Sequence, residues 1–298
     1  SGTPLGELAG ALAEHRQYLP FDPPFVEEGA TLGGTVAAGL SGSGAQRHGR
    51  LRDFILACQF VTGDGRLIRS GAKVVKNAAG FDLPKLFTGS LGRLGILTEI
   101  TLKGFPAPAS TRRLRVECRS LEDAVEQLVR LNGSPLVLDG LDLRPPASLM
   151  IRLGGPRSAM EARIERLRTF LDRPVEVITD RSATHGMPAA TDAPTIKVAL
   201  RPTMIARFHQ AIAPTATDCR FLFGGATAGF EWSGPIEDLD RILQDRSLTG
   251  LVLRGETPPV LIGRFHAAPF LDRFKRALDP GNRFPPIVAR AYADTPSR

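Results

Sequence analysis

The clearest alternation of hydrophobic and polar residues closes the stretch KNAAGFDLPKLFTGSLGRLGILTEITLK, residues 76–103. Side chains at 96, 98, 100 and 102 alternate with those at 97, 99, 101 and 103, which predicts a half-buried β-strand with a two-residue period. Glycines at 80, 89, 92 and 95 precede this strand. Such a density of glycine indicates a place where the backbone passes close to another group.

Other patterns in the first third predict one helix and one hairpin. Residues 4–16 form an amphipathic helix with Leu5, Leu8 and Leu12 on one side. The hydrophobic run FILACQFVT, the turn GDG at 63–65 and the run RLIRSG together predict a β-hairpin.

The rest of the chain predicts a second α+β region. GFPAPAS (104–110) is typical of a linker. After it, the order strand (TRRLRVEC), helix (SLEDAVEQLVRLNG), two strands and a helix (PRSAMEARIERLRTFLD) matches a ferredoxin-like α+β unit. Ser120 is the expected N-cap of the first of these helices, and Gly133 its end. A last helix, APFLDRFKRALDPGNRF, ends at Asp279-Pro280-Gly281, and no internal repeat is visible.

Composition excludes several classes of protein. With 298 residues, 42% of them hydrophobic, the chain is long enough for two domains. No apolar run is long enough to span a membrane, and the first residues do not form a secretory signal. The three cysteines, Cys58, Cys118 and Cys219, are too far apart for a disulfide framework, a redox pair or an iron–sulfur site, which favours a reducing cytoplasm.

The net charge of +7 comes from 32 arginines and six lysines scattered among 31 acidic residues. A nucleic-acid surface would cluster these cations with aromatic residues, so we expect no nucleic-acid partner. A basic face for an acidic partner or a small anion stays open.

The glycine-rich segment EEGATLGGTVAAGLSGSGAQRHG (27–49) suits an anion bound by main-chain donors. A helix starting near Gly33-Gly34 would point its positive end at a pyrophosphate. The segment contains neither a P-loop nor a Rossmann fingerprint. The alternative interpretation is a tight glycine-rich turn without a ligand.

Taken together, ATLGG, RHG, Arg52-Asp53, GFDLPKLFTGS and GRLGILTEITLK resemble the flavin domain of the vanillyl-alcohol oxidase / PCMH-type FAD-binding family. The resemblance implies FAD as cofactor, with ATLGG at the diphosphate, the RHG–Arg–Asp turn at the flavin ring and the GILTE strand at the adenosine half. The cofactor-binding residues it implies are Gly29, Ala30, Thr31, Leu32, Gly33, Gly34, Arg47, His48, Gly49, Arg50, Asp53, Gly92, Gly95 and Ile96.

Within this family, ATLGGTVAAGLSG, RLRDFILACQFVTGDG and FKRALDP most resemble the E-type subunits of bacterial glycolate oxidase (glycolate dehydrogenase). The implied fold is α+β: the C-terminal part of a PCMH-type FAD-binding domain over 1–104, a ferredoxin-like α+β cap over 105–264, and a helix and tail over 265–298 that return to the FAD domain. Family members carry a further glycine-rich FAD loop ahead of this start, so we expect part of a flavin site here.

The implied function is that of an FAD-binding subunit converting glycolate to glyoxylate. Its implied partners are a catalytic flavoprotein subunit and an iron–sulfur subunit, in a cytoplasmic complex associated with the inner membrane. Two alternatives are a structural subunit that keeps the fold and binds no FAD, and an independent FAD-dependent dehydrogenase of a lactate-type 2-hydroxy acid.

Oxidation of a 2-hydroxy acid needs a hydride acceptor, a base near the hydroxyl and a cation for the carboxylate. His48, beside the predicted flavin turn, is the candidate base, and a plain surface histidine is the alternative. No two of the five histidines have a metal-binding spacing, so we expect no metal site.

Overall fold

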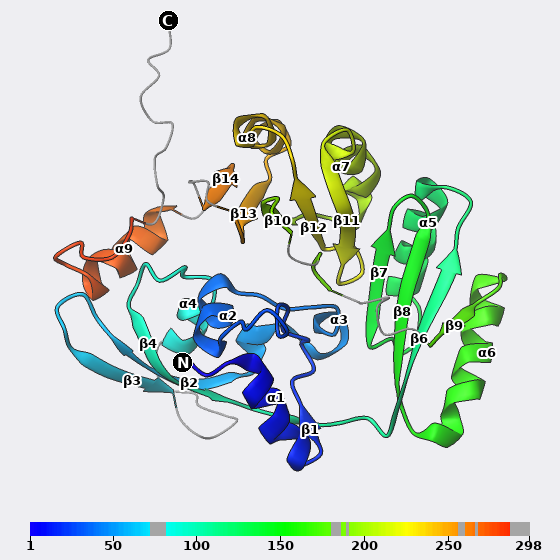
Figure 1. The fold of residues 1–298 in the computed structure, drawn as a ribbon, viewed down its shortest axis with the longest axis horizontal. Helices are drawn as coiled ribbons and strands as arrows, with labels where there is room; N and C mark the ends of the chain where they lie inside the picture. Colours follow the sequence, from blue (N-terminus) through cyan, green and yellow to red (C-terminus); the bar gives the residue numbers. More distant parts are fainter. Residues whose placement is uncertain (72–81, 180–185, 189–190, 256–259, 266–267, 287–298) are drawn as a thin grey trace, which may run out of the picture.

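The computed structural model describes residues 1–71, 82–179, 186–188, 191–255, 260–265 and 268–286. The chain forms a smaller region around a three-stranded sheet and a larger region around a nine-stranded sheet. Figure 1 shows the smaller region at the lower left and the larger sheet, with its helices, along the top and right. This mixture of helices with antiparallel sheets confirms the predicted α+β class.

The smaller region is built mainly from the first third of the chain. Its elements are α1 (Leu5–Glu14), β1 (Gln17–Tyr18), α2 (Leu32–Ala38), α3 (Ala45–His48), the 3-10 turn η1 (Leu51–Asp53), β2 (Ile55–Val61), β3 (Leu67–Gly71), α4 (Leu83–Phe87), β4 (Ile96–Leu102) and β5 (Phe105–Pro106). The predicted helix and hairpin are therefore confirmed, as α1 and as β2 with β3. Positions 76–81 of the glycine-rich stretch, including Gly80, lie outside the described residues.

Strand β4 exists where the alternation predicts it, but the alternation is interrupted. The pairing of β2 with β4 shifts register between Gln59↔Glu99 and Phe60↔Leu97, so Thr98 is an extra residue in the strand. Such a bulge turns the following residues by one face. As a result Leu97 and Ile100 both pack inward, whereas Ile96 is 57% exposed. The expectation that Ile96 and Ile100 share one face is wrong for this reason.

The expected linker at 104–110 is partly a strand. Phe105 and Pro106 form β5, which pairs antiparallel with Tyr18 and Gln17 of β1. The phenyl ring of Phe105 packs at 5.7 Å from that of Phe54. The chain is thus held by backbone pairing and by the core of the smaller region as it enters the larger sheet.

The larger region contains two successive units of the same kind. The first comprises β6 (Ser110–Glu117), α5 (Leu121–Asn132), β7 (Gly140–Arg144), β8 (Ser148–Gly155), η2 (Arg157–Ala159), α6 (Met160–Leu171) and β9 (Glu176–Ile178); the second comprises β10 (Thr195–Ala199), η3 (Pro202–Met204), α7 (Ile205–Ile212), β11 (Ala216–Leu222), β12 (Thr227–Trp232), α8 (Ile236–Asp245) and β13 (Thr249–Val252), followed by β14 (Leu261–Gly263).

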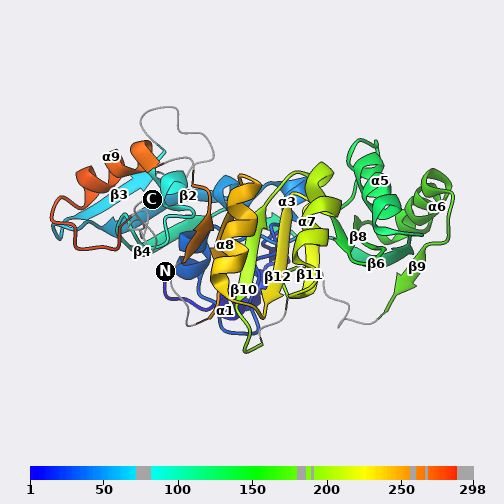
Figure 2. The same ribbon diagram turned by 90° about the horizontal axis from the view of Figure 1, so that it is seen from above.

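Both units have the strand order of a ferredoxin-like fold. The sheet runs β14-β13-β10-β12-β11-β7-β8-β6-β9, so in each unit the fourth strand lies beside the first, then the third, then the second. The sequence predicts only one such unit and no repeat, and the structure corrects both expectations. The units meet edge to edge where β11 pairs with β7, at Phe221↔Leu143. Figure 2 shows α5 and α6 over one unit and α7 and α8 over the other.

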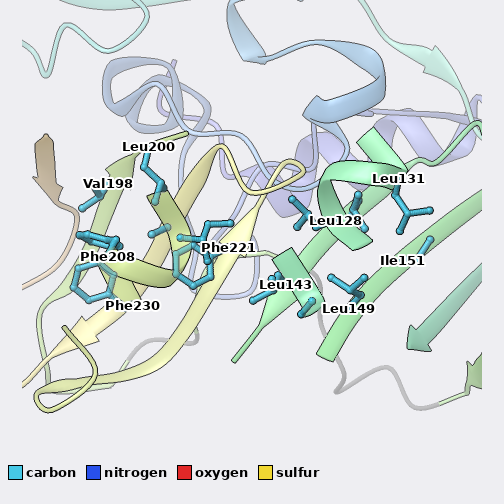
Figure 3. Packing of buried hydrophobic residues seen from close by; sticks show 14 of the residues in the cluster. Leu128, Leu131, Leu143, Leu149, Ile151, Val198, Leu200, Phe208, Phe221 and Phe230 are labelled. Carbon is cyan, nitrogen blue, oxygen red and sulfur yellow. The ribbon is translucent and has the colours of Figure 1, made fainter. Parts of the chain in front are cut away.

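The helices and one face of the large sheet enclose a continuous core across the junction of the two units. Figure 3 shows Phe221 of the second unit and Leu143 of the first close to this junction, with Leu128 and Phe208 contributed by helices on either side. The N-cap prediction for α5 is confirmed, because the Ser120 hydroxyl accepts a hydrogen bond from the Asp123 N–H at 3.2 Å.

The last helix, α9 (Ala268–Leu278), packs back onto the smaller region. Leu271, Phe274 and Leu278 lie against a cluster containing Phe60 and Phe87. Beyond the helix, the buried Asp279 carboxylate accepts hydrogen bonds from the Lys275 ammonium and from the Phe284 N–H, the latter at 2.8 Å. Burial by itself raises the pKa of Asp279, but these donors outweigh it and lower the pKa to about 2.

Asp279→Asn should lower the free energy of unfolding by about 3 kcal/mol, because it leaves the buried Lys275 ammonium without its counter-ion. The folded-state pKa lies below the ordinary 3.8, so the stabilisation is complete above that value and is lost as the pH falls toward 2. Urea unfolding from pH 6 down to the acid limit measures both effects. The exposed Asp272→Asn on the same helix is the control; equal stability of the two variants would contradict the expectation.

Candidate functional site

Helix α2 begins at the predicted diphosphate segment, and its first N–H groups have acceptors. Thr31 is the N-cap and accepts from the Gly34 N–H at 3.1 Å. The Leu32 N–H donates to the Thr3 carbonyl at 2.9 Å, and the Gly33 N–H to the Ser1 carbonyl at 2.7 Å. The donors that the glycine-rich pattern predicts are thus present, and carbonyl oxygens from residues 1–3 occupy the acceptor positions.

Ser1 also joins this helix to the bulge in β4. Its backbone nitrogen donates to the Thr98 carbonyl at 2.9 Å, and its hydroxyl donates to the Leu97 carbonyl. The structure therefore brings the segment 29–34 close to the strand that begins at Ile96. An FAD diphosphate fits these amides as an acceptor, provided that it takes the place of the Ser1 and Thr3 carbonyls.

The glycines of the predicted site differ in their surroundings. Gly29 and Gly92 have positive φ angles of 77° and 70°, and a Cβ on either would meet no atom within 4 Å. A Cβ on Gly95 would lie 2.8 Å from the Val61 carbonyl oxygen and 3.3 Å from the Phe60 ring. Close packing within the chain therefore explains Gly95, and a turn conformation explains Gly29 and Gly92. Their contact with a cofactor stays a prediction.

The predicted flavin-ring turn, residues 47–53, is held by its own hydrogen bonds. The Asp53 carboxylate accepts from the Arg50 N–H at 2.9 Å, and a Cβ on Gly49 would collide with the same carboxylate oxygen at 2.9 Å. The guanidinium of Arg50 lies over the ring of Phe223 in the second unit, 5.9 Å from its centroid. Asp53 therefore orients this turn, and Arg50 extends from it to the large sheet.

His48 lies between the two regions. Its ring contacts Phe105 and Tyr18 edge-on, at centroid distances of 5.8 and 6.4 Å. Its Nε2 atom is 3.5 Å from the Asp139 carboxylate and makes no hydrogen bond within the described chain. Burial, together with the positive charge of Arg47, lowers the pKa of His48 despite Asp139, so the ring is neutral near pH 7. The side chain is only 14% exposed, which does not fit a plain surface histidine.

Three carboxylates connect the smaller region to the first unit of the large sheet. Asp22 accepts from the Gly44 N–H at 2.8 Å and from the Arg152 guanidinium. Asp139 accepts from the Arg47 guanidinium and from a backbone N–H of β8. Asp142 accepts from the Ser43 hydroxyl. Sequence patterns missed all three, because each lies in or near a strand or loop whose local sequence carries no motif.

Lys197 connects the second unit of the large sheet to the smaller region. Its ammonium group donates to the Gly39 carbonyl at the C-terminal end of α2, at 3.0 Å. Burial, and secondarily the charge of Arg50, lower the pKa of Lys197 to about 8.

A cleft opens beside these contacts. Two adjoining cavities of about 320 and 530 Å³ lie between α1, β1 and the strands of the first unit. Four side chains line both cavities: Tyr18, Asp22, Arg113 and Arg152. None of the residues predicted from the sequence lines either cavity, although Arg47 and His48 contact the cleft through Asp139.

Comparison with known proteins identifies the N-terminal part of the chain. Residues 1–71 match the family described as FAD binding domain. The resemblance drawn from ATLGG and the neighbouring motifs is therefore confirmed, and the cofactor of the matched family is FAD.

Curated relatives share a similar stretch of sequence. Identity is 42% over 166 residues with glycolate oxidase subunit GlcE of Escherichia coli (strain K12), covering 56% of this chain and 47% of that protein. It is 39% over 125 residues with a D-lactate dehydrogenase of Anaerostipes hadrus, covering 42% and 26%. Glycolate oxidase subunit GlcD of Bacillus subtilis (strain 168) is 32% identical over 160 residues, covering 51% and 33%. The chain thus spans less than half the length of each of these relatives.

Nearly the whole chain resembles a solved structure in its fold. A solved structure of alkyldihydroxyacetonephosphate synthase superposes with a TM-score of 0.65 at 14% identity, covering 96% of this chain and 63% of that one. At this identity the comparison shows a shared fold. Within the described ranges, no helix is long and apolar enough to cross a membrane, and no group of three or more candidate ligands is arranged around a metal position.

Lys197→Met should flatten the alkaline part of the stability profile. The folded-state pKa of about 8 lies below the ordinary 10.5, so between these values the unfolded chain binds more protons and raising the pH favours folding. Over this window we expect the free energy of unfolding of the wild type to rise by about 1–2 kcal/mol more than that of the variant. This is less than the full pKa shift would give, because the side chain is partly exposed. Urea unfolding between pH 7.5 and 10 measures it. Lys85→Met, at a more exposed site, should follow the wild type; parallel profiles for Lys197→Met would contradict the assignment.

Proposed function

We propose that this chain is an FAD-binding subunit of a glycolate oxidase, which converts a 2-hydroxy acid to the 2-oxo acid. The observation that carries the proposal is the match of residues 1–71 to the FAD binding domain family, together with 42% identity to the GlcE subunit over 166 residues. The D-lactate dehydrogenases among the relatives support the 2-hydroxy acid class.

The chain's own residues would contribute binding and orientation. The Leu32 and Gly33 amides would hold the cofactor diphosphate, and the turn 47–53, fixed by Asp53, would lie beside the flavin. FAD, when bound, supplies the hydride acceptor. A neutral His48 can accept a proton, but its Nε2 faces Asp139, so its role as base stays a candidate role.

A second function is favoured by one observation. The amides at the start of α2 already have acceptors in Ser1 and Thr3. A subunit that keeps this arrangement would bind no FAD and would serve to hold a complex together. An independent lactate-type dehydrogenase remains the third alternative, supported by the D-lactate dehydrogenase relatives.

Partners and location follow from the proposal. We infer a catalytic flavoprotein subunit and an iron–sulfur subunit as partners, because the chain resembles one subunit of a glycolate oxidase and its three cysteines are too few for a four-thiolate cluster. The same free thiols favour the cytoplasm, and association with the inner membrane would be through the complex.

The first test is the flavin spectrum of the purified chain after incubation with FAD and gel filtration, followed by addition of glycolate. We expect a retained flavin band that glycolate bleaches when the partner subunits are present. A chain that stays colourless would favour the structural subunit. A band bleached by D-lactate, without partners and faster than by glycolate, would favour the independent dehydrogenase.

Gly33→Val should weaken FAD binding about tenfold or more. Its side chain would stand where a Cβ already meets Ser1 at 2.9 Å, and so would block an acceptor from the amides. Loss of one hydrogen bond to a charged group costs about 1.5–3 kcal/mol. Gly10→Val on α1, where a Cβ meets no atom within 4 Å, is the matched control. Fluorescence titration of FAD measures both, and equal affinities would exclude α2 as the diphosphate site.

A further inference from the structure

The cleft between the two regions contains a cation that no group in the described chain neutralises. Arg113 of β6 lies directly opposite Arg152 of β8 in the antiparallel pair. Their neighbours Leu114 and Ile151 point into the core, so both guanidinium groups stand on the other face of the sheet. Like charges directly opposite each other destabilise a strand pair.

The other charges of the cleft are already matched. Arg152 is paired with Asp22, and Asp139 accepts from Arg47. Arg113 has no hydrogen bond or ion pair among the described residues, although it lines both cavities. Counting the described residues alone, the cleft therefore has one positive charge without a partner, in a space large enough for a small organic acid.

A second donor lines the same two cavities as this cation. The Tyr18 side chain also lines both cavities, and its hydroxyl makes no hydrogen bond within the described residues. Burial, and then the charges of Asp139 and Asp22, raise the pKa of this hydroxyl, so it keeps its proton over the physiological range. A planar guanidinium with an adjacent hydroxyl is the donor set that a carboxylate accepts from.

We propose that this cleft binds a small carboxylic acid, with Arg113 pairing with its carboxylate and Tyr18 donating a hydrogen bond to it. The carboxylate class rests on the unmatched guanidinium, whereas the choice of a 2-hydroxy acid within that class rests on the proposed function. In that case the carboxylate end of the substrate lies in this cleft and is bound by Arg113 of the first unit of the large sheet.

Calorimetric titration of glycolate into the 298-residue chain, without FAD, tests the site. We expect saturable binding that Arg113→Gln weakens about tenfold or more, since a charge-assisted hydrogen bond is lost. Tyr18→Phe should weaken it several-fold. The uncharged glycolamide should not bind. Arg115→Gln is the matched control, because Arg115 lies two residues along the same strand face and is already paired with Glu176.

Two further measurements distinguish a loss of glycolate binding from a loss of folding, and this binding site from the proposed function. Arg113→Gln should not lower the Tm, because Arg113 makes no hydrogen bond or ion pair among the described residues and lies opposite Arg152 in the strand pair. Glycolate affinity that is unchanged in Arg113→Gln, equal affinity for glycolamide, or no saturation up to about 20 mM would overturn the proposal. Glycolate binding that depends on Arg113 in a chain that neither retains FAD nor oxidises glycolate would uphold the site and refute the proposed function.

Discussion

The arrangement of the whole molecule depends on the three carboxylates that join its two regions. Asp22 projects from the loop after β1, whereas Asp139 and Asp142 belong to the first unit of the large sheet. Each accepts hydrogen bonds from the opposite region, through Arg152, Arg47 and Ser43 respectively. Partly buried interactions of this kind add little net stability, but leaving a carboxylate without its partner is costly. They therefore select one relative placement of the two regions, and this placement creates the cleft.

The large sheet also depends on contacts between parts that are distant in the sequence. Two ferredoxin-like units join through a single short pairing between β11 and β7, and the side chains on both sides of it share one core. The joined sheet is long enough to contact the smaller region at two places, through Asp142 in one unit and Lys197 in the other. A single unit could not make both contacts. Duplication thus gives the smaller region a wide platform, and α9 returns to its far side.

The sequence predicted those elements that depend on residues close together along the chain. The amphipathic helix at 5–14, the hairpin around 63–65 and the Ser120 cap each depend on residues within a few positions, and each was predicted from the sequence. The second α+β unit was missed although its strand β12 alternates, with Ala228, Phe230 and Trp232 in the core. Its sheet depends on the pairing of β10 with β12 and β13, which lie far along the chain. The bulge at Thr98 was missed because it depends on pairing with β2, which lies about 40 positions away along the chain.

The sequence likewise predicts only part of the candidate site. Motif resemblance predicts residues that would approach a ligand through the backbone, such as Gly33. It has no means of finding Arg113 or Tyr18, which line one cleft only when the sheet meets α1 and β1. The two sites also differ physically. The amides of α2 must always have an acceptor, so a ligand there has to displace the carbonyls of Ser1 and Thr3. Arg113 lines the cleft and has no partner among the described residues, so a carboxylate would add to the cleft without displacing any of these groups. Binding in the cleft therefore does not require the rearrangement at α2, and the organic acid can bind before the cofactor site is filled.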